Sequence, residues 1–451
     1  MSANGKFEPA WQLCSLKTTE HTFYMSGKTY KEKGLKIPKV YYLLIIGILV
    51  LACGNSKVVH EQGLPKAAPE NLGLSTETLD KIAPALQEYV DKGQLPGFLT
   101  VIAKDGNIVH FNPLGMRDVE NQKPVETDTI FRIYSMSKPI TSVAVMILYQ
   151  DGHFKLDDPV EKFIPVFKDM KVFNKEQTET HDAKNKMTIK HLLTHTAGLT
   201  YGWGNNPISK LYGELKIFKS DSTLAEMAEK LGDIPLVHEP GKRWNYGVAT
   251  DVLGYLVEVV SNMPFEEFLQ TRLFGPLGMV DTGFSVPKEK VDRYAALYRP
   301  NDKGGLRLVD NAPLANDELS FFPSGGGGLV STATDYLRFC QMLLNGGELD
   351  GVRILSKQTV ELMRYPHHQY RQNAAFGLGF NVVTKVGENN KGRGIGTYSW
   401  AGAASTVFWI DPEEKLVAIL MTQLLNNRYG FAREFEKLAY QAIRNSEASS
   451  N

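Results

Sequence analysis

The sequence predicts an α+β fold in which strands near both ends of the chain form one antiparallel sheet. Two strand-and-turn patterns, at 98–111 and 405–421, lie far apart in the chain. Helical apolar spacing dominates 152–320 between them, and a further helical pattern lies beside each hairpin, at 75–92 and 429–445. Terminal helices packed on an antiparallel sheet are the layering of an α+β domain. We therefore expect one mixed α/β domain with a mostly helical domain inserted into it.

The first helix and the first hairpin are predicted from apolar spacing and a turn. The apolar residues of the helix over 75–92 recur at helical spacing, and they are Leu79, Ile82, Leu86 and Val90. The two apolar strand patterns that follow flank Asp105-Gly106. An Asp-Gly pair supplies the positive φ angles that a tight hairpin turn requires, so the two strands should pair directly.

The next helix, over 137–151, should be buried because apolar side chains occupy nearly all of its faces. Pro139 falls in its first turn, where a proline costs little. Further helices are predicted at 189–193, 224–231, 250–261 and 265–274. The stretches at 170–188 and 298–317 are polar and weakly patterned, and we interpret them as connections.

The late part of the chain predicts a second hairpin and the closing helix. Apolar strand patterns flank Asp411-Pro412-Glu413-Glu414, and an amphipathic helix follows over 429–445. The mixed α/β domain is therefore expected to comprise 75–150 and 320–446, and the helical insertion domain 151–319.

Charge and cysteine content exclude several function classes. Lys plus Arg and Asp plus Glu are each 50, which leaves no basic excess for a nucleic-acid-binding face. Three dispersed cysteines, Cys14, Cys53 and Cys340, cannot form a disulfide framework or a four-ligand zinc site. His191 and His195 have the spacing of a zinc helix but lack the glutamate of that motif. We predict no metal, no cofactor and no nucleic-acid partner.

The N-terminal 53 residues have the pattern of an export signal. Lysines precede an apolar run of roughly 13 residues at 40–52, which is short of the ~20 that span a bilayer. The run ends in Val-Leu-Ala-Cys, which resembles a bacterial lipobox with Cys53 as the lipidated residue. Met25 is a candidate true start. A plain signal peptide or a buried strand are the alternatives. The lipobox interpretation predicts a lipid-anchored protein of the bacterial cell envelope, with 54–74 as its tether.

The strongest chemical motif is Ser-x-x-Lys at Ser135 and Lys138, at the start of the predicted buried helix. Positions i and i+3 share a helix face, so the amine can reach the hydroxyl. A serine needs such a base to become a nucleophile. The motif also occurs at Ser285 and Lys288, with a proline inside it and no long apolar helix after it. Helix context therefore favours Ser135 over Ser285, while an ordinary N-cap serine remains the alternative.

Two further stretches complete a candidate site. Tyr246 lies in a glycine-bounded turn before a helix, and a tyrosine hydroxyl near a lysine can transfer protons. The late stretch from Trp400 through Ala401 and Gly402 to Ala403 carries small residues, which let backbone approach a ligand and form an oxyanion hole. The alternative for Tyr246 is a tyrosine packed with its hydroxyl at the surface, and the alternative for the late stretch is an ordinary strand start after a glycine-rich loop.

In these motifs the sequence resembles the serine β-lactamase/penicillin-binding-protein superfamily, and within it class C β-lactamases and family VIII carboxylesterases. The matching stretches span about 70–425 and are 131–139, 192–199, 246–254, 276–282 and 324–332. The resemblance implies a β-lactamase/transpeptidase-like fold and an acyl-enzyme on Ser135. It implies Lys138 and Tyr246 as the proton-handling pair, and the backbone amides of Ser135 and Ala403 as the oxyanion hole. Trp400, Ala401 and Gly402 would replace the Lys-Thr-Gly triplet of the family and bind substrate.

Two departures from the family pattern bear on the substrate. Val248 stands where the Tyr-x-Asn motif has its amide, and Trp400 stands where the triplet has its lysine. Losing polar partners of the substrate can change discrimination by orders of magnitude. The expected function is therefore a serine hydrolase of small-molecule esters. A β-lactamase or D-amino-acid peptidase, acting on amides, is the first alternative, and a non-catalytic penicillin-binding or sensor protein is the second.

Overall fold

The computed structural model describes residues 63–219, 221–310, 322–386 and 392–449. The predicted signal peptide over 1–53, including Met25 and Cys53, lies outside the described residues. So does the predicted tether as far as residue 62.

The described part of the predicted tether, from Gly63 on, packs against the sheet. Lys66 forms a parallel bridge with Ile108, and Leu74 is fully buried. Chain 63–74 is thus part of the folded body. A membrane-spanning helix is not found in the described part of the chain, where every helix is too short or too polar.

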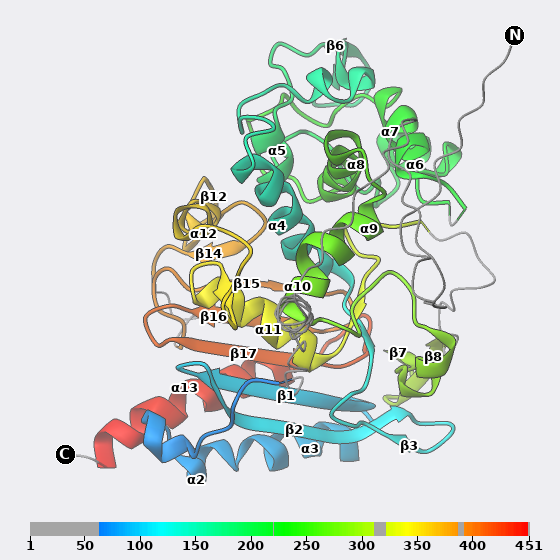
Figure 1. Ribbon diagram of the computed structural model, residues 1–451. Coiled ribbons are helices and arrows are strands. Elements are labelled where there is room, and N and C mark those ends of the chain that lie inside the picture. The colour runs from blue at the N-terminus through cyan, green and yellow to red at the C-terminus, as the bar shows by residue number, and fades with distance from the viewer. Residues whose placement is uncertain (1–62, 220, 311–321, 387–391, 450–451) are drawn as a thin grey trace, which may run out of the picture. The chain divides into compact units, whose positions relative to one another are not determined.

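Nine strands form one antiparallel sheet in the order β12-β13-β14-β15-β16-β17-β1-β2-β3, as Figure 1 shows. Strands from the two ends of the chain meet where β17 pairs with β1. This confirms the predicted α+β class and its antiparallel sheet. The strand bounds are β1 (Gly97–Lys104), β2 (Asn107–Asp118), β3 (Lys123–Pro124), β12 (His368–Arg371), β13 (Ala374–Phe376), β14 (Asn381–Val383), β15 (Tyr398–Ala401), β16 (Val407–Asp411) and β17 (Leu416–Met421).

The predicted hairpins have the expected turns and pairings. Asp105 and Gly106 join β1 to β2 with φ angles of 50° and 78°, the left-handed values of a type I′ turn. The strands β16 and β17 pair antiparallel from Val407 opposite Leu420 to Asp411 opposite Leu416. Both hairpins lie next to each other in the centre of the sheet.

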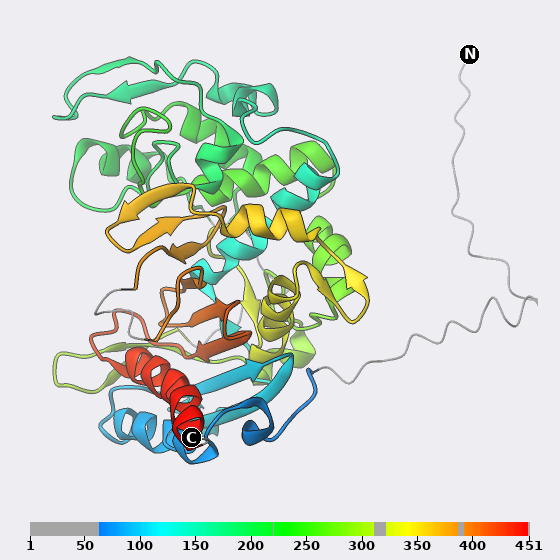
Figure 2. The same ribbon diagram turned by 90° about the vertical axis from the view of Figure 1, so that its left-hand side faces the viewer.

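The sheet is covered on both faces, so its central strands carry apolar side chains on both faces. Along β1, Leu99 and Val101 join the core that contains α4 (Ser137–Gln150), whereas Phe98 and Ile102 join a second core. That second core lies under the terminal helices, which pack against one another in both views (Figures 1 and 2). Those helices are α2 (Thr76–Leu79), α3 (Ile82–Asp91) and α13 (Phe431–Ser449). The predicted helix over 75–92 is thus interrupted between Leu79 and Ile82.

The middle of the chain is mostly helical, and α8 packs directly on the buried α4. The helix bounds are α5 (Ile189–Leu193), α6 (Pro207–Glu214), α7 (Leu224–Gly232), α8 (Ala249–Ser261), α9 (Phe265–Leu269) and α10 (Gly275–Leu277). The helix predicted over 265–274 is present, as an α-helix to Leu269 and a π-helical turn over Gln270–Phe274 that leads to Pro276. In the later chain come α11 (Ala333–Leu344) and α12 (Lys357–Arg364). The residue boundaries of the insertion domain stay a prediction.

Two small hairpins lie in the stretches that the sequence analysis interpreted as connections. They are β5 (Lys171–Phe173) with β6 (Thr180–Asp182), and β7 (Leu297–Pro300) with β8 (Leu306–Asp310). The three residues of β6 are all exposed, so no apolar alternation marks them. In β8, Leu306 and Leu308 do alternate with exposed residues, a short period-two signal that the sequence analysis missed.

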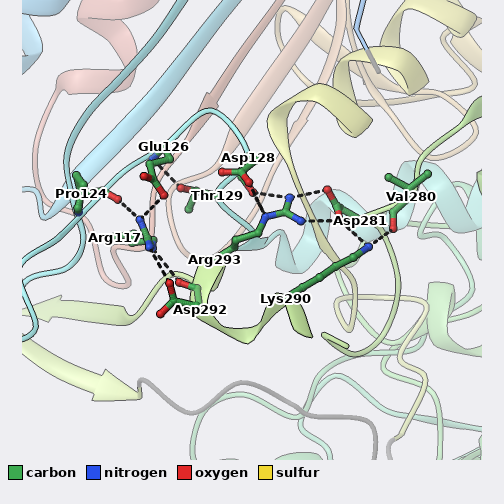
Figure 3. A network of polar contacts seen from close by, with 10 residues as sticks. All are labelled: Arg117, Pro124, Glu126, Asp128, Thr129, Val280, Asp281, Lys290, Asp292 and Arg293. Carbon is green, nitrogen blue, oxygen red and sulfur yellow. Dashed lines mark hydrogen bonds and ion pairs between the residues drawn. The ribbon is translucent and has the colours of Figure 1, made fainter. Parts of the chain in front are cut away.

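A network of charged side chains joins the loop after β3 to the segment 280–293, and Figure 3 shows it from close by. Arg117, almost fully buried, bonds the carbonyl of Pro124 and the carboxylate of Glu126. Arg293 bridges the Asp128 carbonyl and both carboxylate oxygens of Asp281. Single exposed ion pairs stabilise little, but a connected network holds its segments in register. This one fixes the chain that leads into β4 (Phe131–Arg132).

Candidate active site

Ser135 lies in a one-turn 3-10 helix (Tyr134–Met136) between β4 and α4. The residue before it, Tyr134, has a φ of 45°, which is uncommon for a residue with a side chain. The turn is held from both sides, because Ile133 N–H donates to Leu329 O and Met136 N–H donates to Ile133 O. Strained backbone of this kind persists where surrounding structure determines it. Here it places a half-buried serine at the N-terminal end of a buried helix.

Lys138 is 1% exposed and lies one turn further along the same helix face. Its ammonium group donates to Ser135 Oγ at 3.3 Å, to Tyr201 Oη at 2.8 Å and to the Gly326 carbonyl at 2.6 Å. Each of the three N–H groups of the ammonium thus has an acceptor, so the buried amine is fully hydrogen-bonded. The rings of Tyr201 and Tyr246 also lie 5.2 Å and 4.6 Å from Nζ, within the range of a cation–π interaction.

Tyr246 reaches the same serine from the loop before α8. Its hydroxyl donates to Ser135 Oγ at 2.6 Å. Gly247 makes this approach possible, because a Cβ there would lie 2.6 Å from Thr200 Cα. The structure thus brings together the three side chains, Ser135, Lys138 and Tyr246, that the sequence analysis selected.

Sequence reasoning missed two groups beside this centre, Tyr201, which contacts Lys138, and Asp251, which is linked to Lys138 through Gly326. Tyr201 accepts a hydrogen bond from Lys138, and burial together with the charge of Asp251 raises the pKa of its hydroxyl well above the usual range. Asp251 is fully buried at the start of α8, and its Oδ1 accepts hydrogen bonds from Ser324 and from Gly326 N–H. A lone carboxylate within the apolar pattern of 249–257 was the signal for Asp251. Tyr201 carried no such signal.

One residue, Gly326, links the buried carboxylate to the buried amine. Gly326 N–H donates to Asp251 at 3.0 Å, while Gly326 C=O accepts from Lys138 at 2.6 Å. Burial raises the pKa of the Asp251 carboxyl, and the charge of Lys138 opposes that shift. A Cβ on Gly326 would lie 2.5 Å from Asp251 Oδ2, so this close approach requires glycine. The glycine-rich loop therefore passes directly beside the active site.

The strand β15 and the residues after it form the opposite wall. Gly402 lies against the turn that carries Ser135, since a Cβ on it would be 2.4 Å from Ile133 O. Trp400 packs against Tyr246 at 5.7 Å between ring centroids. Ala403 and Ser135 border the same pocket. Ser135 lies at the first turn of its helix, where backbone N–H groups generally lack an intrahelical partner and can serve an oxyanion hole.

A cavity of about 540 Å³ opens above Ser135. Five of its lining residues are aromatic, and the whole lining comprises Ser135, Trp203, Trp244, Tyr246, Tyr370, Arg371, Asn381, Arg393, Ser399, Trp400, Ala401, Gly402, Ala403 and Val407. Trp203 is 71% exposed and stacks on Tyr201 at 4.7 Å, so it forms the outer rim. Aromatic walls with a few polar groups are typical of sites for small organic ligands.

His191 and His195, the pair with zinc-helix spacing, have separate structural roles. The ring of His191 accepts the Thr188 N–H and so completes the cap of α5. His195 is buried among the rings of Trp244, Tyr246 and Phe376. Burial, reinforced by the charge of Lys138, lowers its pKa well below the usual range. Within the described ranges, His, Cys, Asp and Glu side chains do not gather in groups of three that could hold a metal ion.

Comparison with known proteins identifies the family of this site. A family model described as Beta-lactamase matches residues 82–441. Protein Rv1367c of Mycobacterium tuberculosis is 36% identical over 365 residues, which cover 76% of this chain and 90% of that protein. Esterase EstB of Burkholderia gladioli is 29% identical over 358 residues, or 73% of this chain and 86% of that protein.

A solved structure agrees in fold over a similar length. EstCE1, described as a hydrolase with promiscuous acyltransferase activity, has a TM-score of 0.71 and 26% identity, and the match covers 81% of this chain and 99% of that one. These matches confirm the resemblance that the motifs predict. The chain belongs to the Beta-lactamase family, and it is a serine hydrolase by class.

Proposed function

We propose that this chain cleaves carboxylic esters of small molecules through a covalent acyl-enzyme on Ser135. The observation that carries the proposal is the double hydrogen bond at Ser135 Oγ, from Tyr246 at 2.6 Å and from Lys138 at 3.3 Å. A nucleophile within hydrogen-bond reach of its base, with further groups orienting that base, is the arrangement of covalent catalysis. Tyr201 and the Gly326 carbonyl are the orienting groups for Lys138.

Counting protons indicates which form of the pair is active. With an ammonium at Lys138 and a phenol at Tyr246, both groups donate to Ser135 and neither can accept its proton. The active form therefore carries one proton fewer on the pair, shared between the amine and the phenol.

The reaction then proceeds in two balanced halves. Ser135 Oγ bonds to the ester carbonyl carbon while its proton passes to the Lys138–Tyr246 pair, and the carbonyl electrons move onto the oxygen between the Ser135 and Ala403 amides. Collapse of this intermediate breaks the carbon–alkoxide bond, and the pair returns the proton to the leaving alcohol. Water repeats the sequence on the acyl-enzyme and releases the acid.

The choice of esters over β-lactams and peptides is supported by two positions at which this chain departs from the family motifs. Trp400 lies where the family triplet has lysine, and its indole packs against Tyr246 and Phe376. Val248 lies where the Tyr-x-Asn motif has an amide, and it is fully buried in the core. The esterase activity in the name of EstB is consistent with this choice. A β-lactamase or D-amino-acid peptidase with the same machinery is the alternative.

Burst kinetics tests this function. We expect the wild type to release nitrophenol from p-nitrophenyl butyrate in a burst of one equivalent per enzyme, and to act on nitrocefin far more slowly. Ser135→Ala should abolish the burst, while Ser285→Ala, the matched variant in the second Ser-x-x-Lys, should retain it. Fast nitrocefin turnover with slow ester turnover would favour the β-lactamase alternative. Stable acylation without turnover would favour the sensor alternative. Equal ester turnover by Ser135→Ala would refute a serine mechanism.

The same burst assay addresses acyl transfer. EstCE1 is described as a hydrolase with promiscuous acyltransferase activity, and both outcomes share one acyl-enzyme. An added alcohol that accelerates nitrophenol release and appears as a new ester would show transfer. Acid as the sole product would show hydrolysis alone.

We further propose that Cys53 is lipidated and holds the protein at a membrane of the cell envelope. The support is the basic, apolar and Val-Leu-Ala-Cys pattern at the N-terminus. Metabolic labelling with an alkyne fatty acid in a bacterial host should label the wild type and not Cys53→Ser. Equal labelling of both, or none, would contradict lipidation at Cys53.

A further inference from the structure

We propose that the pocket wall around Ser399 binds an anionic group of the substrate, a carboxylate at the end remote from the scissile ester. The inference rests on the proposed ester hydrolysis and specifies the substrate class of that site. The wall consists of Tyr370, Asn381, Arg393 and Ser399, all of which line the cavity that contains Ser135.

A directed chain of hydrogen bonds runs along this wall. The Tyr370 hydroxyl donates to Asn381 Oδ1 at 2.6 Å, which orients the amide so that its Nδ2 donates to Ser399 Oγ at 3.3 Å. Arg393 Nη1 donates to the same oxygen at 3.1 Å. Hydrogen bonds arranged head to tail polarise one another, so the last donor in the chain is strengthened.

Ser399 is the last member of the chain, and its own proton has no acceptor among the described residues. A hydroxyl group has two acceptor sites and one donor. The amide and the guanidinium occupy both acceptor sites. Ser399 is only 4% exposed and lines the cavity, so the acceptor within its reach is an oxygen of a ligand in the cavity rather than bulk water. A buried donor left unpaired costs free energy, which a substrate oxygen would recover.

The charge of the cavity favours an anion over a neutral acceptor. Two arginines, Arg371 and Arg393, line the cavity, and none of its described lining residues is acidic. Arg393 is held rigidly, paired with Glu436 of α13 at 2.8 Å and stacked over Trp409 at 4.9 Å. Its Nε–H is buried without a partner in the described structure. Arg371 is exposed at the cavity edge and lies over the Tyr370 ring. Guanidinium and hydroxyl donors together match a carboxylate.

The length of chain between Ser399 and the proposed oxyanion hole limits where that carboxylate lies. Strand β15 ends at Ala401, and Ala403, the proposed oxyanion-hole residue, follows Ser399 by four positions. A fully extended chain rises at most ~3.6 Å per residue, so the two residues are no more than about 14 Å apart. The apolar chain of a medium-length dicarboxylic acid covers this distance, and the aromatic rings of the cavity would pack against its methylene groups. A half-ester of such an acid is the substrate class that fits.

Two matched substrate pairs test the inference. The first is monoethyl suberate against its carboxamide analogue, followed by ethanol release. The second is 6-acetoxyhexanoate against 6-acetoxyhexanamide, which puts the charge on the alcohol side. In each pair a carboxylate is replaced by a neutral amide of nearly the same size and shape. We expect kcat/KM to favour the carboxylate by about tenfold or more in at least one pair, as for a hydrogen bond to a charged group. A ratio near one in both pairs overturns the inference.

Variants of the wall locate the effect. Ser399→Ala and Arg393→Gln should each reduce the carboxylate-to-amide ratio several-fold, and Arg371→Gln should reduce it less because its guanidinium is exposed. Lys385→Gln removes one positive charge from an exposed position outside the cavity, so it should leave the ratio unchanged. Arg393→Gln also leaves Glu436 unpaired, so its folding is checked by thermal unfolding, while Ser399→Ala keeps that ion pair. A ratio that Ser399→Ala and a folded Arg393→Gln both leave unchanged contradicts the assignment.

Binding without turnover separates this inference from the proposed function. Ser135→Ala titrated with each substrate pair, and followed by tryptophan fluorescence, should bind a carboxylate more tightly than its amide. In the double variant that combines Ser135→Ala with Ser399→Ala, the difference in affinity between carboxylate and amide should disappear. If the wild type cleaves no ester but this difference is present, the anion site stands and the ester function fails. If esters are cleaved at Ser135 but neither binding nor turnover discriminates, the anion site fails and the ester function stands.

Discussion

The chain carries Ser-x-x-Lys twice, and the two copies differ in everything except the motif. At Ser135 a turn with positive φ at Tyr134 leads into fourteen residues of helix, of which twelve are buried. At Ser285 the chain continues through Pro287 into the 3-10 helix Lys288–Arg293, in which no residue is buried. Lys138 is 1% exposed, whereas Lys288 is exposed. The motif places two side chains near each other, but burial decides whether the amine is held and whether water is excluded.

The two copies of the motif also differ in the burial and the ion pairing of the acidic residue near each of them. Near Ser135, Asp251 is fully buried, and the backbone of Gly326 lies between its carboxylate and Lys138. Near Ser285, Asp281 is paired directly with Arg293 and Lys290 at the surface network of Figure 3. Lys138 is linked to that carboxylate through Gly326, and one of its N–H groups is directed to Ser135 Oγ. A charge in direct ion pairs is already satisfied.

Replacing each lysine by methionine should give the largest contrast. Lys138→Met keeps the volume but removes the amine that contacts Ser135, so kcat/KM for p-nitrophenyl butyrate should fall by about 10²–10⁴-fold, the usual contribution of a proton-transferring group. Lys288→Met should change it less than about twofold, within the range of surface substitutions. Equal losses in both variants would remove the distinction between the two copies.

Adding a methyl group to one glycine in each region should give the next largest contrast. Gly326→Ala places a Cβ 2.5 Å from Asp251 Oδ2, so the loop that holds Lys138 has to shift. We expect a loss of about 1–3 kcal/mol in the free energy of unfolding, together with reduced kcat. Gly283→Ala has 3.7 Å of clearance to Ser285 O and should be nearly neutral. Urea denaturation and ester turnover measure both. A tolerated Gly326→Ala would show that the loop is not tightly packed.

The smallest expected effect is a difference in the pH dependence of stability. Burial, opposed by Lys138, raises the pKa of Asp251 above the usual 3.8. The folded state then holds its proton more tightly than the unfolded chain, and stability falls as pH rises from 3.8 through the folded pKa. Asp251→Asn should remove that fall.

Asp281 should behave in the opposite way. Burial alone would raise its pKa, but the hydrogen bonds and charges of Arg293 and Lys290 outweigh burial and hold the pKa below the usual value. Its contribution to stability is present at higher pH and is lost as pH falls below 3.8 through the folded pKa. Asp281→Asn should remove that acid-side loss. Denaturation midpoints of both variants and the wild type over a pH series measure how each carboxyl group changes stability with pH. Contributions of the same sign from Asp251 and Asp281 would contradict the assignment.

Local patterns predicted much of the fold because local chemistry decides it. The Asp105-Gly106 pair adopts the positive φ angles that its residue types favour, and the apolar stretch after Pro139 forms the buried α4. The hairpin β5–β6 escaped prediction because its strands are three residues long and β6 is exposed, so no periodicity could mark them.

The sequence by itself determined the family, the antiparallel sheet from both ends of the chain, and the selection of Ser135, Lys138 and Tyr246. Those features depend on residue type and order, which a motif preserves. Only the tertiary structure decided what surrounds them: Tyr201 beside the amine, Asp251 behind Gly326, and the wall at Ser399. These groups come from segments distant in the chain, so no local pattern carries their contacts. Packing around the buried helix brings them within hydrogen-bonding distance.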